Sequence, residues 1–270
     1  MSNAIVVVCR WPLHSELCAF YQSIDSYDVY MIVPEDTETE MLTTFETRYP
    51  KIQFITISDT QCIASHTHNC ESTSILKKDI GIWDRAMCLA FRPHFLNYPF
   101  VWFLEDAVFF NSTCCLQDAD TKFGAVDLLA NVSFDQSLVE EEIEWSKIEI
   151  QLNGPYYQGL LYGCRLSKKA LCDIFEYSAK HKTLFSHEIL WPTLASKQSW
   201  NVLQTVPREF KTITIRDRFK FPAEFNKCGF FHPMIHPEHH TMIRDYYQNP
   251  SIIEGFPVYR PSDYPMVVFR

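Results

Sequence analysis

The run AIVVVC at residues 4–9 is apolar at every position and is followed by Arg10. A continuous β-branched run of this kind is typical of a strand that is buried on both faces of a parallel sheet. Outward from it, segments with strand and helix patterns alternate as far as residue 57. The expected elements are strands over 4–9, 27–33 and 52–57 and helices over 13–24 and 37–48. This βαβαβ order predicts an α/β fold with a mostly parallel central sheet, flanking helices and a Rossmann-like, nucleotide-binding first half.

A second informative stretch is VWFLEDAVFF at residues 101–110. Its apolar start, residues 101–104, leads directly into the adjacent carboxylates Glu105 and Asp106. In an open α/β sheet, ligands bind beyond the carboxyl ends of the strands, so we expect this acidic pair to face a site rather than the core. Burying both charges without a partner would cost several kcal/mol or force their neutralisation. The pattern therefore predicts a cation, a ribose hydroxyl or a basic group beside the pair.

Composition limits the classes of function. The 270 residues are 47% hydrophobic, which is enough for a sizeable core, and we expect one compact domain. With 24 basic and 33 acidic residues the formal net charge is −9, which argues against broad nucleic-acid binding and against an anionic membrane surface. The run at 4–9 is too short for a signal sequence or a membrane span. The ten cysteines show no CxxC spacing, so we expect reduced thiols in a soluble, cytoplasmic protein.

Other segments carry weaker patterns. The expected structures are a polar loop over 59–74, a helix over 80–90, a solvated acidic face over 140–150, a turn at 163–167 and a helix over 168–179. His66 and His68 in the polar loop have a spacing that can bind metal, and scattered surface histidines are the alternative.

The segment FSHEILWPTLA at residues 185–195 begins with His187 and Glu188 and continues as an apolar, aromatic stripe. A carboxylate flanked by Trp and Phe side chains has its pKa raised by desolvation, as a general base requires. Alternatively, Glu188 is an acid in a first helical turn that interacts favourably with the helix dipole. The residues alone leave both interpretations open.

The last third of the chain holds two clusters with different chemistry. Histidines gather in the segment His232–His240. Arg216, Arg218 and Lys220 follow an expected strand over 211–215, and guanidinium groups suit phosphate oxygens. Ordinary surface charge and exposed histidines are the alternative for each residue taken singly.

Several of these segments, in their order along the chain, resemble a GT-A-fold glycosyltransferase. The segments are Trp83–Ala86, the strand into Glu105 and Asp106, Gly163–Ser167, and His187 with Glu188. Together they are most similar to the small soluble transferases of large DNA viruses and algae. The stretch around Glu188 is also similar to a segment of the core-2 N-acetylglucosaminyl and peptide xylosyl transferases in which a Glu is the base.

The resemblance implies a single GT-A-like domain over 1–270, with a nucleotide-sugar-binding half at 1–110 and an acceptor-side half at 111–270. It implies an inverting glycosyltransferase that moves a sugar from a nucleoside diphosphate sugar to a hydroxyl of a glycan or glycoprotein. The donor is expected to be UDP-linked, with UDP-xylose as the first candidate, and Glu188 is expected to be the general base. A viral origin would place the enzyme in the cytoplasm of the host.

The resemblance also assigns residues to the donor. Arg10 and Trp11 lie where GT-A folds receive the nucleotide, although a place in the core is the favoured alternative for Trp11. Asp84 and Arg85 would contact the ribose or the donor sugar, or else form a salt bridge on their helix. The complete set of implied donor-binding residues is Arg10, Trp11, Asp84, Arg85, Glu105, Asp106, Arg216, Arg218 and Lys220.

Metal dependence is left open by the sequence. Many GT-A enzymes hold Mn²⁺ with an acidic motif whose last Asp touches the ion, and some add a late His. Here Asp106 and His232 would be the ligands, but Ala107 stands at the third position of the motif. The late Arg and Lys cluster is the alternative source of positive charge for the diphosphate.

Two further functions fit the same residues. A metal-dependent hydrolase would use the segment His232–His240 with Glu105 and Asp106, although the chain lacks a His-Glu-x-x-His motif. A catalytically silent relative that binds a sugar or a nucleotide would account for Ala107 in the acidic motif.

Overall fold

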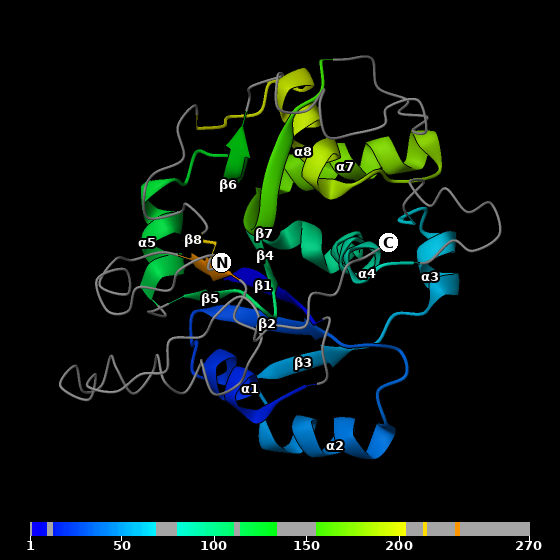
Figure 1. The fold of residues 1–270 in the computed structure, drawn as a ribbon, viewed down its shortest axis with the longest axis vertical. Helices are drawn as coiled ribbons and strands as arrows, with labels where there is room; N and C mark the ends of the chain where they lie inside the picture. Colours follow the sequence, from blue (N-terminus) through cyan, green and yellow to red (C-terminus); the bar gives the residue numbers. More distant parts are fainter. Residues whose placement is uncertain are drawn as a thin grey trace, which may run out of the picture.

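A computed structural model describes residues 2–9, 13–68, 80–110, 114–133, 155–203, 213–214 and 230–232. Its centre is a six-stranded sheet with the strand order β3-β2-β1-β4-β7-β6 (Figure 1). The strands are β1 Asn3–Val8, β2 Tyr27–Ile32, β3 Ile52–Ile55, β4 Phe100–Glu105, β6 Leu128–Ser133 and β7 Gln158–Ser167. Strands β1 to β4 run parallel to one another, and β7 is antiparallel to both β4 and β6. The prediction of an α/β fold with a mostly parallel central sheet is therefore confirmed.

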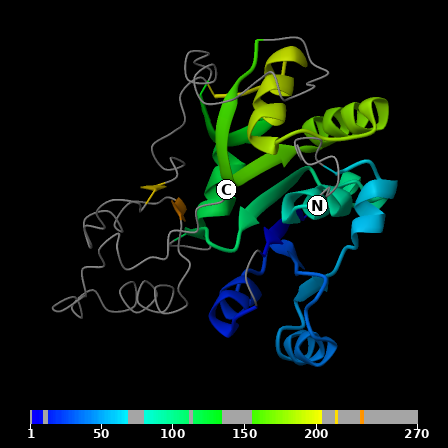
Figure 2. The same cartoon turned by 45° about the vertical axis from the view of Figure 1, so that its right-hand side comes forward.

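Helices cover both faces of this sheet. The helices are α1 Ser15–Gln22, α2 Thr39–Arg48, α3 Asp59–Ala64, α4 Ile82–Ala90, the 3₁₀ helix Pro93–Asn97, α5 Cys114–Lys122, α7 Lys168–His181 and α8 His187–Lys197. One cluster of buried side chains joins the sheet to α4, α7 and α8, and a second joins it to α1 and α5, with side chains of α2 packed against it. In Figure 2 the yellow-green helices α7 and α8 lie at one end of the sheet and the blue helices α1 and α2 at the other. Among the described residues, no helix combines the length and apolar character that crossing a bilayer requires.

The order of the strands creates a crevice beside β1. The chain first adds β2 and β3 on one side of β1 and then returns through α3 and α4 to place β4 on the other side. The connections that leave the carboxyl ends of β1 and β4 therefore diverge, and ligands of open α/β sheets bind at such a switch point. β4 ends at Glu105, so the acidic pair lies at this crevice.

A second, three-stranded sheet begins directly beyond the acidic pair. Its order is β5-β9-β8, and its strands are β5 Phe109–Phe110, β8 Ile213–Thr214 and β9 Phe230–His232. Phe109 pairs with Phe231 in antiparallel register. This pairing brings the backbone of residues 230–232, which are distant in sequence, to the carboxyl end of β4.

Two local predictions are wrong. Residues 163–167 are not a turn but the last part of β7, paired with β4. A strand is favoured there because Cys164 and Leu166 are buried against α4, α7 and α8, while Arg165 between them is buried on the other face. Residues 59–64 of the expected loop form α3, because Ser58 and Gln61 make a capping box at its start.

Other predictions fall wholly or partly outside the described residues. The acidic segment 140–150 lies outside them, as does the end of the polar loop expected over 59–74. Of the strand expected over 211–215, the structure describes β8. The helix expected over 168–179 is confirmed as α7, and the Ser167 hydroxyl caps it by accepting a hydrogen bond from the amide of Ala170 at 3.2 Å.

Candidate functional site

A short turn beside β1 holds the carboxyl end of β4. The amide of Asp106 donates to the carbonyl of Val8 at 3.1 Å, which prolongs the parallel pairing by one residue. The amide of Val108 donates to the carbonyl of Glu105 at 2.9 Å, so the chain turns directly after the acidic pair. Glu105 and Asp106 are thereby fixed at the crevice between β1 and β4.

The two carboxylates lie on opposite faces of the sheet, as adjacent residues at a strand end do. Glu105 is 2% exposed and accepts a hydrogen bond at 2.8 Å from the indole nitrogen of Trp83. Asp106 is 6% exposed and lies near Cys9 and Tyr21. Burial raises the pKa of the Cys9 thiol and of the Tyr21 hydroxyl, and the charge of Asp106 raises both pKa values further. We expected the pair to face one open site, and side-chain alternation instead separates the two carboxylates and buries both.

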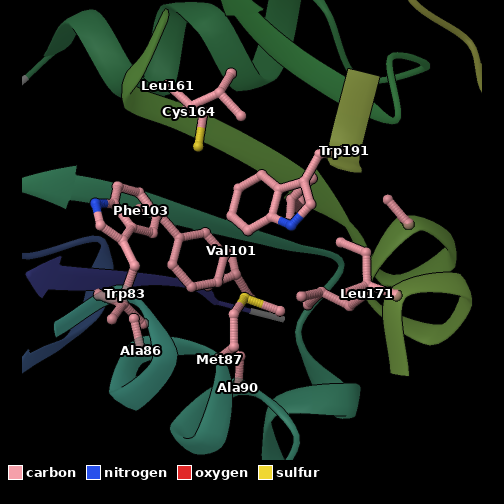
Figure 3. Close-up of a cluster of buried hydrophobic side chains, with 14 of the residues drawn as sticks. Trp83, Ala86, Met87, Ala90, Val101, Phe103, Leu161, Cys164, Leu171 and Trp191 are labelled. Atoms are coloured by element: carbon pink, nitrogen blue, oxygen red, sulfur yellow. The ribbon is translucent and has the colours of Figure 1, made fainter. Parts of the chain in front are cut away.

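Trp83 connects Glu105 to α8. Its ring stacks on the imidazole of His187, with ring centroids 4.0 Å apart and an angle of 20° between the planes. Trp191, one turn further along α8, meets the Trp83 ring edge-on at 5.8 Å. Figure 3 shows Trp83 and Trp191 in the same buried cluster as Phe103 of β4. The first turn of α8 is therefore packed against the residue that binds Glu105.

Glu188 is the second residue of α8 and is half-buried. It follows His187, so the expected base lies at the same edge of the sheet as Glu105. Its place in the first turn of α8 is also one in which the helix dipole favours a negative charge. Both interpretations of Glu188, a general base and an acid at a helix start, agree with this position.

A pocket with a volume of about 410 Å³ opens beside the crevice. Its lining residues are Cys9 after β1, Pro34, Glu35 and Asp36 after β2, and Ile82 and Arg85 at the start of α4. The volume lies in the range of small-molecule sites. Because Cys9 also lies near Asp106, the pocket adjoins this acid.

Arg85 holds the walls of this pocket together. Its guanidinium donates to the carbonyls of Ile57 at 2.7 Å and Ile80 at 2.9 Å, and to the carboxylate of Asp59 at 2.5 Å. The carboxylate of Glu35 is 3.6 Å away. Arg85 thus ties the ends of β2 and β3 to α4, which agrees with the salt-bridge alternative, and at the same time it forms part of the pocket wall.

Asp84 stabilises the start of the same helix. Its Oδ2 accepts a hydrogen bond from the amide of Gly81 at 2.8 Å, and the residue is 8% exposed. This contact satisfies a backbone donor that the first turn of α4 would otherwise leave unpaired. It gives Asp84 a structural role next to the pocket.

Glu35 and Asp36 are pocket residues that the sequence analysis did not single out. A signal was present, because these two acids follow the strand expected over 27–33 in the way that Glu105 and Asp106 follow β4. The carboxyl ends of parallel strands meet at one edge of the sheet, so acids after either strand belong to the same region.

Several expected site residues lie outside the described part of the chain. They are Arg10, Trp11, Arg216, Arg218 and Lys220. His232 is described for its backbone, as the last residue of β9, where it pairs with Thr214. Because β9 also pairs with β5, this backbone runs beside the turn that follows Asp106.

The described residues do not form a metal site by themselves. Among them, no group of three or more His, Cys, Asp or Glu side chains is arranged to hold an ion. Ala107 is 6% exposed and offers no ligand atom in its side chain.

No protein-family model matches this chain, and no curated protein matches it either. Solved structures are similar to it. A 4-diphosphocytidyl-2C-methyl-D-erythritol synthase from Anaerococcus prevotii is 11% identical over 91% of this chain and 95% of its own, with a TM-score of 0.45. An active-site mutant of LgtC is 10% identical over 90% and 95%, with a TM-score of 0.49. Mouse xyloside xylosyltransferase 1 in its apo form is 12% identical over 74% and 76%, with a TM-score of 0.34. Likeness of this degree transfers no activity to this chain.

Proposed function

We propose that the chain is a glycosyltransferase that moves a sugar from a nucleoside diphosphate sugar to a hydroxyl of a glycan or glycoprotein. One arrangement carries the proposal. A pocket bordered by two carboxylates adjoins Asp106 at the switch point, and the first turn of α8, with Glu188, packs against the residue that binds Glu105. A donor pocket and a candidate base at one edge of the sheet are what a transfer between two bound substrates requires.

The pocket suits the nucleoside end of the donor. Glu35 and Asp36 have exposed carboxylates, which accept hydrogen bonds from ribose hydroxyls. Pro34 and Ile82 supply apolar wall for a base. Arg85 keeps these walls in place through its bonds to three chain segments.

The diphosphate of the donor needs positive charge or backbone N–H donors beside it. Residues 9–15 include no glycine for a phosphate-binding turn. The start of α1 is already capped, because Nδ1 of His14 accepts a hydrogen bond from the amide of Leu17 at 3.2 Å. Burial lowers the pKa of His14 and so favours the neutral form that can accept this bond. Cationic side chains are therefore the first candidates for this charge.

We propose that three late cations, Arg216, Arg218 and Lys220, bind the diphosphate. Arg10 and Trp11 also contact the nucleotide in this proposal. Their residue types fit these tasks, because guanidinium groups bind phosphate oxygens bidentately and an indole stacks on a base.

Mn²⁺ is a further candidate for the same charge. Asp106 and His232 would be its ligands, and the ion would neutralise the diphosphate as it leaves. Because the described residues do not form a metal site, the steps of the reaction are assigned to side chains alone.

Glu188 is the proposed base. Its carboxylate takes the proton of the acceptor hydroxyl while that oxygen forms a bond to the anomeric carbon. The bond from this carbon to the diphosphate oxygen breaks, its electron pair leaves with the nucleoside diphosphate, and the anomeric configuration inverts. Support comes from the resemblance of the stretch around Glu188 to the core-2 and xylosyl transferases and from its place beside the residues that hold Glu105.

UDP-xylose is the first candidate donor on the same resemblance.

A cytoplasmic location is part of the proposal and draws support from the cysteines. Those described as free thiols are Cys9, Cys18, Cys62, Cys88, Cys164 and Cys172. Free thiols are typical of a reducing compartment.

A thermal-shift panel tests the proposal. UDP, GDP, UDP-xylose, UDP-glucose and UDP-N-acetylglucosamine are each added with Mn²⁺ and with EDTA. A ligand at a hundredfold excess over its Kd stabilises the folded state by roughly 2.7 kcal/mol, which is easily detected. We expect stabilisation selective for uridine nucleotides, followed by release of UDP when an acceptor is supplied.

The other outcomes separate the alternatives. No shift with any nucleotide would overturn the proposal. A shift with Zn²⁺ or Mn²⁺ alone would favour the metal-dependent hydrolase. Nucleotide binding without UDP release or sugar transfer would indicate the catalytically silent relative.

A further inference from the structure

We infer that Trp83 is a positioning residue that fixes the Glu105 carboxylate with its indole N–H and fixes the first turn of α8 through its stacking on His187. Its effect on the donor rests on the proposed function, whereas the contacts themselves do not. The pair Trp83 and His187 thereby sets the spacing between the donor-side end of β4 and the acceptor-side helix.

The backbone of Trp83 is firmly anchored. Trp83 is the second residue of α4, whose first turn is closed by the bond from the Gly81 amide to Asp84. Arg85, two residues later, binds the backbone carbonyls of Ile57 and Ile80. The start of α4 therefore has little freedom to move relative to the sheet.

The ring of Trp83 is held as firmly as its backbone. His187 stacks on its face, and Trp191 meets it edge-on at an interplanar angle of 77°. Phe103 of β4 lies 6.2 Å from it, centroid to centroid. Trp83 is 8% exposed, so contacts on several sides fix the direction of its N–H.

That N–H points at Glu105. The 2.8 Å bond to Oε1 is buried, and a buried carboxylate needs such donors because it has lost its hydration. A ring that cannot turn holds its acceptor in one orientation. A ligand that meets Glu105 therefore finds a carboxylate that is already oriented, which lowers the cost of ordering it on binding.

The same ring also determines where α8 begins. His187 is the first residue of α8, and Glu188 follows it. Moving this turn away from β4 would break the stack with Trp83 and the contact of Trp191 with both rings. The position of Glu188 and the orientation of Glu105 are thus coupled through one side chain.

A double-mutant cycle on UDP affinity tests the link from Trp83 to Glu105. We expect Trp83→Phe to weaken UDP binding roughly tenfold, since Glu105 is then no longer oriented before the ligand binds and has to be ordered on binding. In a Glu105→Leu background the same substitution should add less than about twofold, because leucine offers the indole no acceptor and the two changes then remove one interaction. Equal effects in both backgrounds would overturn the inference, since a purely structural role would be additive.

Trp200→Phe is the matched control. Trp200 also donates its indole N–H to a carboxylate, that of Asp173, at 2.6 Å, and it lies beyond the opposite end of α8. We expect it to leave UDP affinity unchanged. A loss equal to that of Trp83→Phe would mean that any lost indole bond has this effect, and would overturn the assignment to Trp83.

The link to α8 is tested by rescue. We expect His187→Ala to lower kcat at saturating donor, and His187→Phe, which keeps an aromatic ring on Trp83, to restore most of it. A His187→Phe variant as slow as His187→Ala would show that stacking is not the reason.

Indole ¹H–¹⁵N spectra separate this inference from the proposed function. Without any ligand, Glu105→Gln should move the Trp83 indole signal and leave that of Trp200 in place, and Asp173→Asn should do the reverse. If the signals behave so and wild-type protein binds no uridine nucleotide, the contact stands and the proposed function fails. If UDP binds but moves no Trp83 signal, the inference fails and the function stands, a result that also decides the case in which Trp83→Phe does not fold.

Discussion

Two indole–carboxylate pairs at opposite edges of the sheet have the same chemistry and different surroundings. Toward the amino ends of the strands, Asp120 of α5 accepts hydrogen bonds from Trp102 at 3.1 Å and from the guanidinium of Arg165 at 2.8 Å, and also from Asn3 and Tyr27. At the carboxyl end of β4, Glu105 accepts from Trp83. The first pair belongs to a closed network that includes its own cation.

The difference shows how to distinguish a carboxylate with a structural role from one at a ligand site. The charge of Asp120 is offset by Arg165, whose guanidinium also donates to the carbonyls of Phe123 and Val126. Removing either partner of such a buried ion pair would leave an uncompensated charge, which is strongly destabilising. Glu105 instead lies at the strand end where open α/β sheets bind ligands, and its partner Trp83 packs against the helix that carries the candidate base.

The largest effect is expected from breaking the network around Asp120. Arg165→Met should lower the free energy of unfolding by about 3–5 kcal/mol, because it leaves Asp120 without its buried cation. Denaturant unfolding measures this, and the UDP affinity of the folded variant should be unchanged. Lys169→Met, at an exposed lysine 3.7 Å from Asp127, is the control and should cost little. A loss below about 1 kcal/mol for Arg165→Met would mean that the network is not a stability element.

The next largest effect is expected at Glu188, on the side of the sheet where β4 ends. Glu188→Gln should lower the rate of sugar transfer by about a hundredfold or more while UDP affinity and stability stay close to wild type, because only the base is removed. Transfer assays and UDP titrations measure the two quantities. Glu176→Gln, on an exposed face of α7, is the control. A Glu188→Gln enzyme that retains most of its rate would exclude Glu188 as the base.

A smaller effect distinguishes Asp106, which follows β4, from Asp120. Asp106→Asn should weaken donor binding about tenfold, as expected for a lost interaction with a charged group. Isothermal titration with UDP, with Mn²⁺ and with EDTA, measures it and shows whether the ion takes part. Asp118→Asn, exposed on α5, should have no effect. An unchanged affinity for Asp106→Asn would place Asp106 with Asp120 among the structural acids.

The smallest effect concerns the pocket. Asp36→Asn should weaken UDP binding about threefold through a lost bond to a ribose hydroxyl. The loss should vanish with the diphosphate of 2′,3′-dideoxyuridine, which lacks both hydroxyls. Glu46→Gln, exposed on α2, serves as control. An equal loss for UDP and its dideoxy analogue would show that Asp36 acts on something other than the ribose.

Local patterns predicted most of the first half of the fold. Residues 4–8 form a fully buried strand, as the apolar run requires, and the alternation up to residue 57 is present. The pattern failed at 163–167, where a glycine indicated a turn although alternate residues are buried on opposite faces of β7. A glycine is a weaker predictor of local structure than pairing with a neighbouring strand on each side, here β4 and β6.

The candidate site was predicted less completely. Glu105 and Asp106 follow the apolar strand as expected, but their separation onto two faces follows from the alternation of side chains along a strand. Glu35 and Asp36 were overlooked because they follow a different strand, and only the sheet order places that strand next to β1. The roles of Glu188 and of the late cations remain predictions.

The sequence by itself determined most strands and helices of the first half, because hydrophobic periodicity and turn residues are local patterns. It also placed two acids at the end of an apolar strand. Only the tertiary structure decided that α8 begins against Trp83, that the indole of Trp83 holds Glu105, and that Arg165 pairs with Asp120. These contacts join segments far apart in sequence, and they arise from strand order and helix packing, which no local pattern encodes.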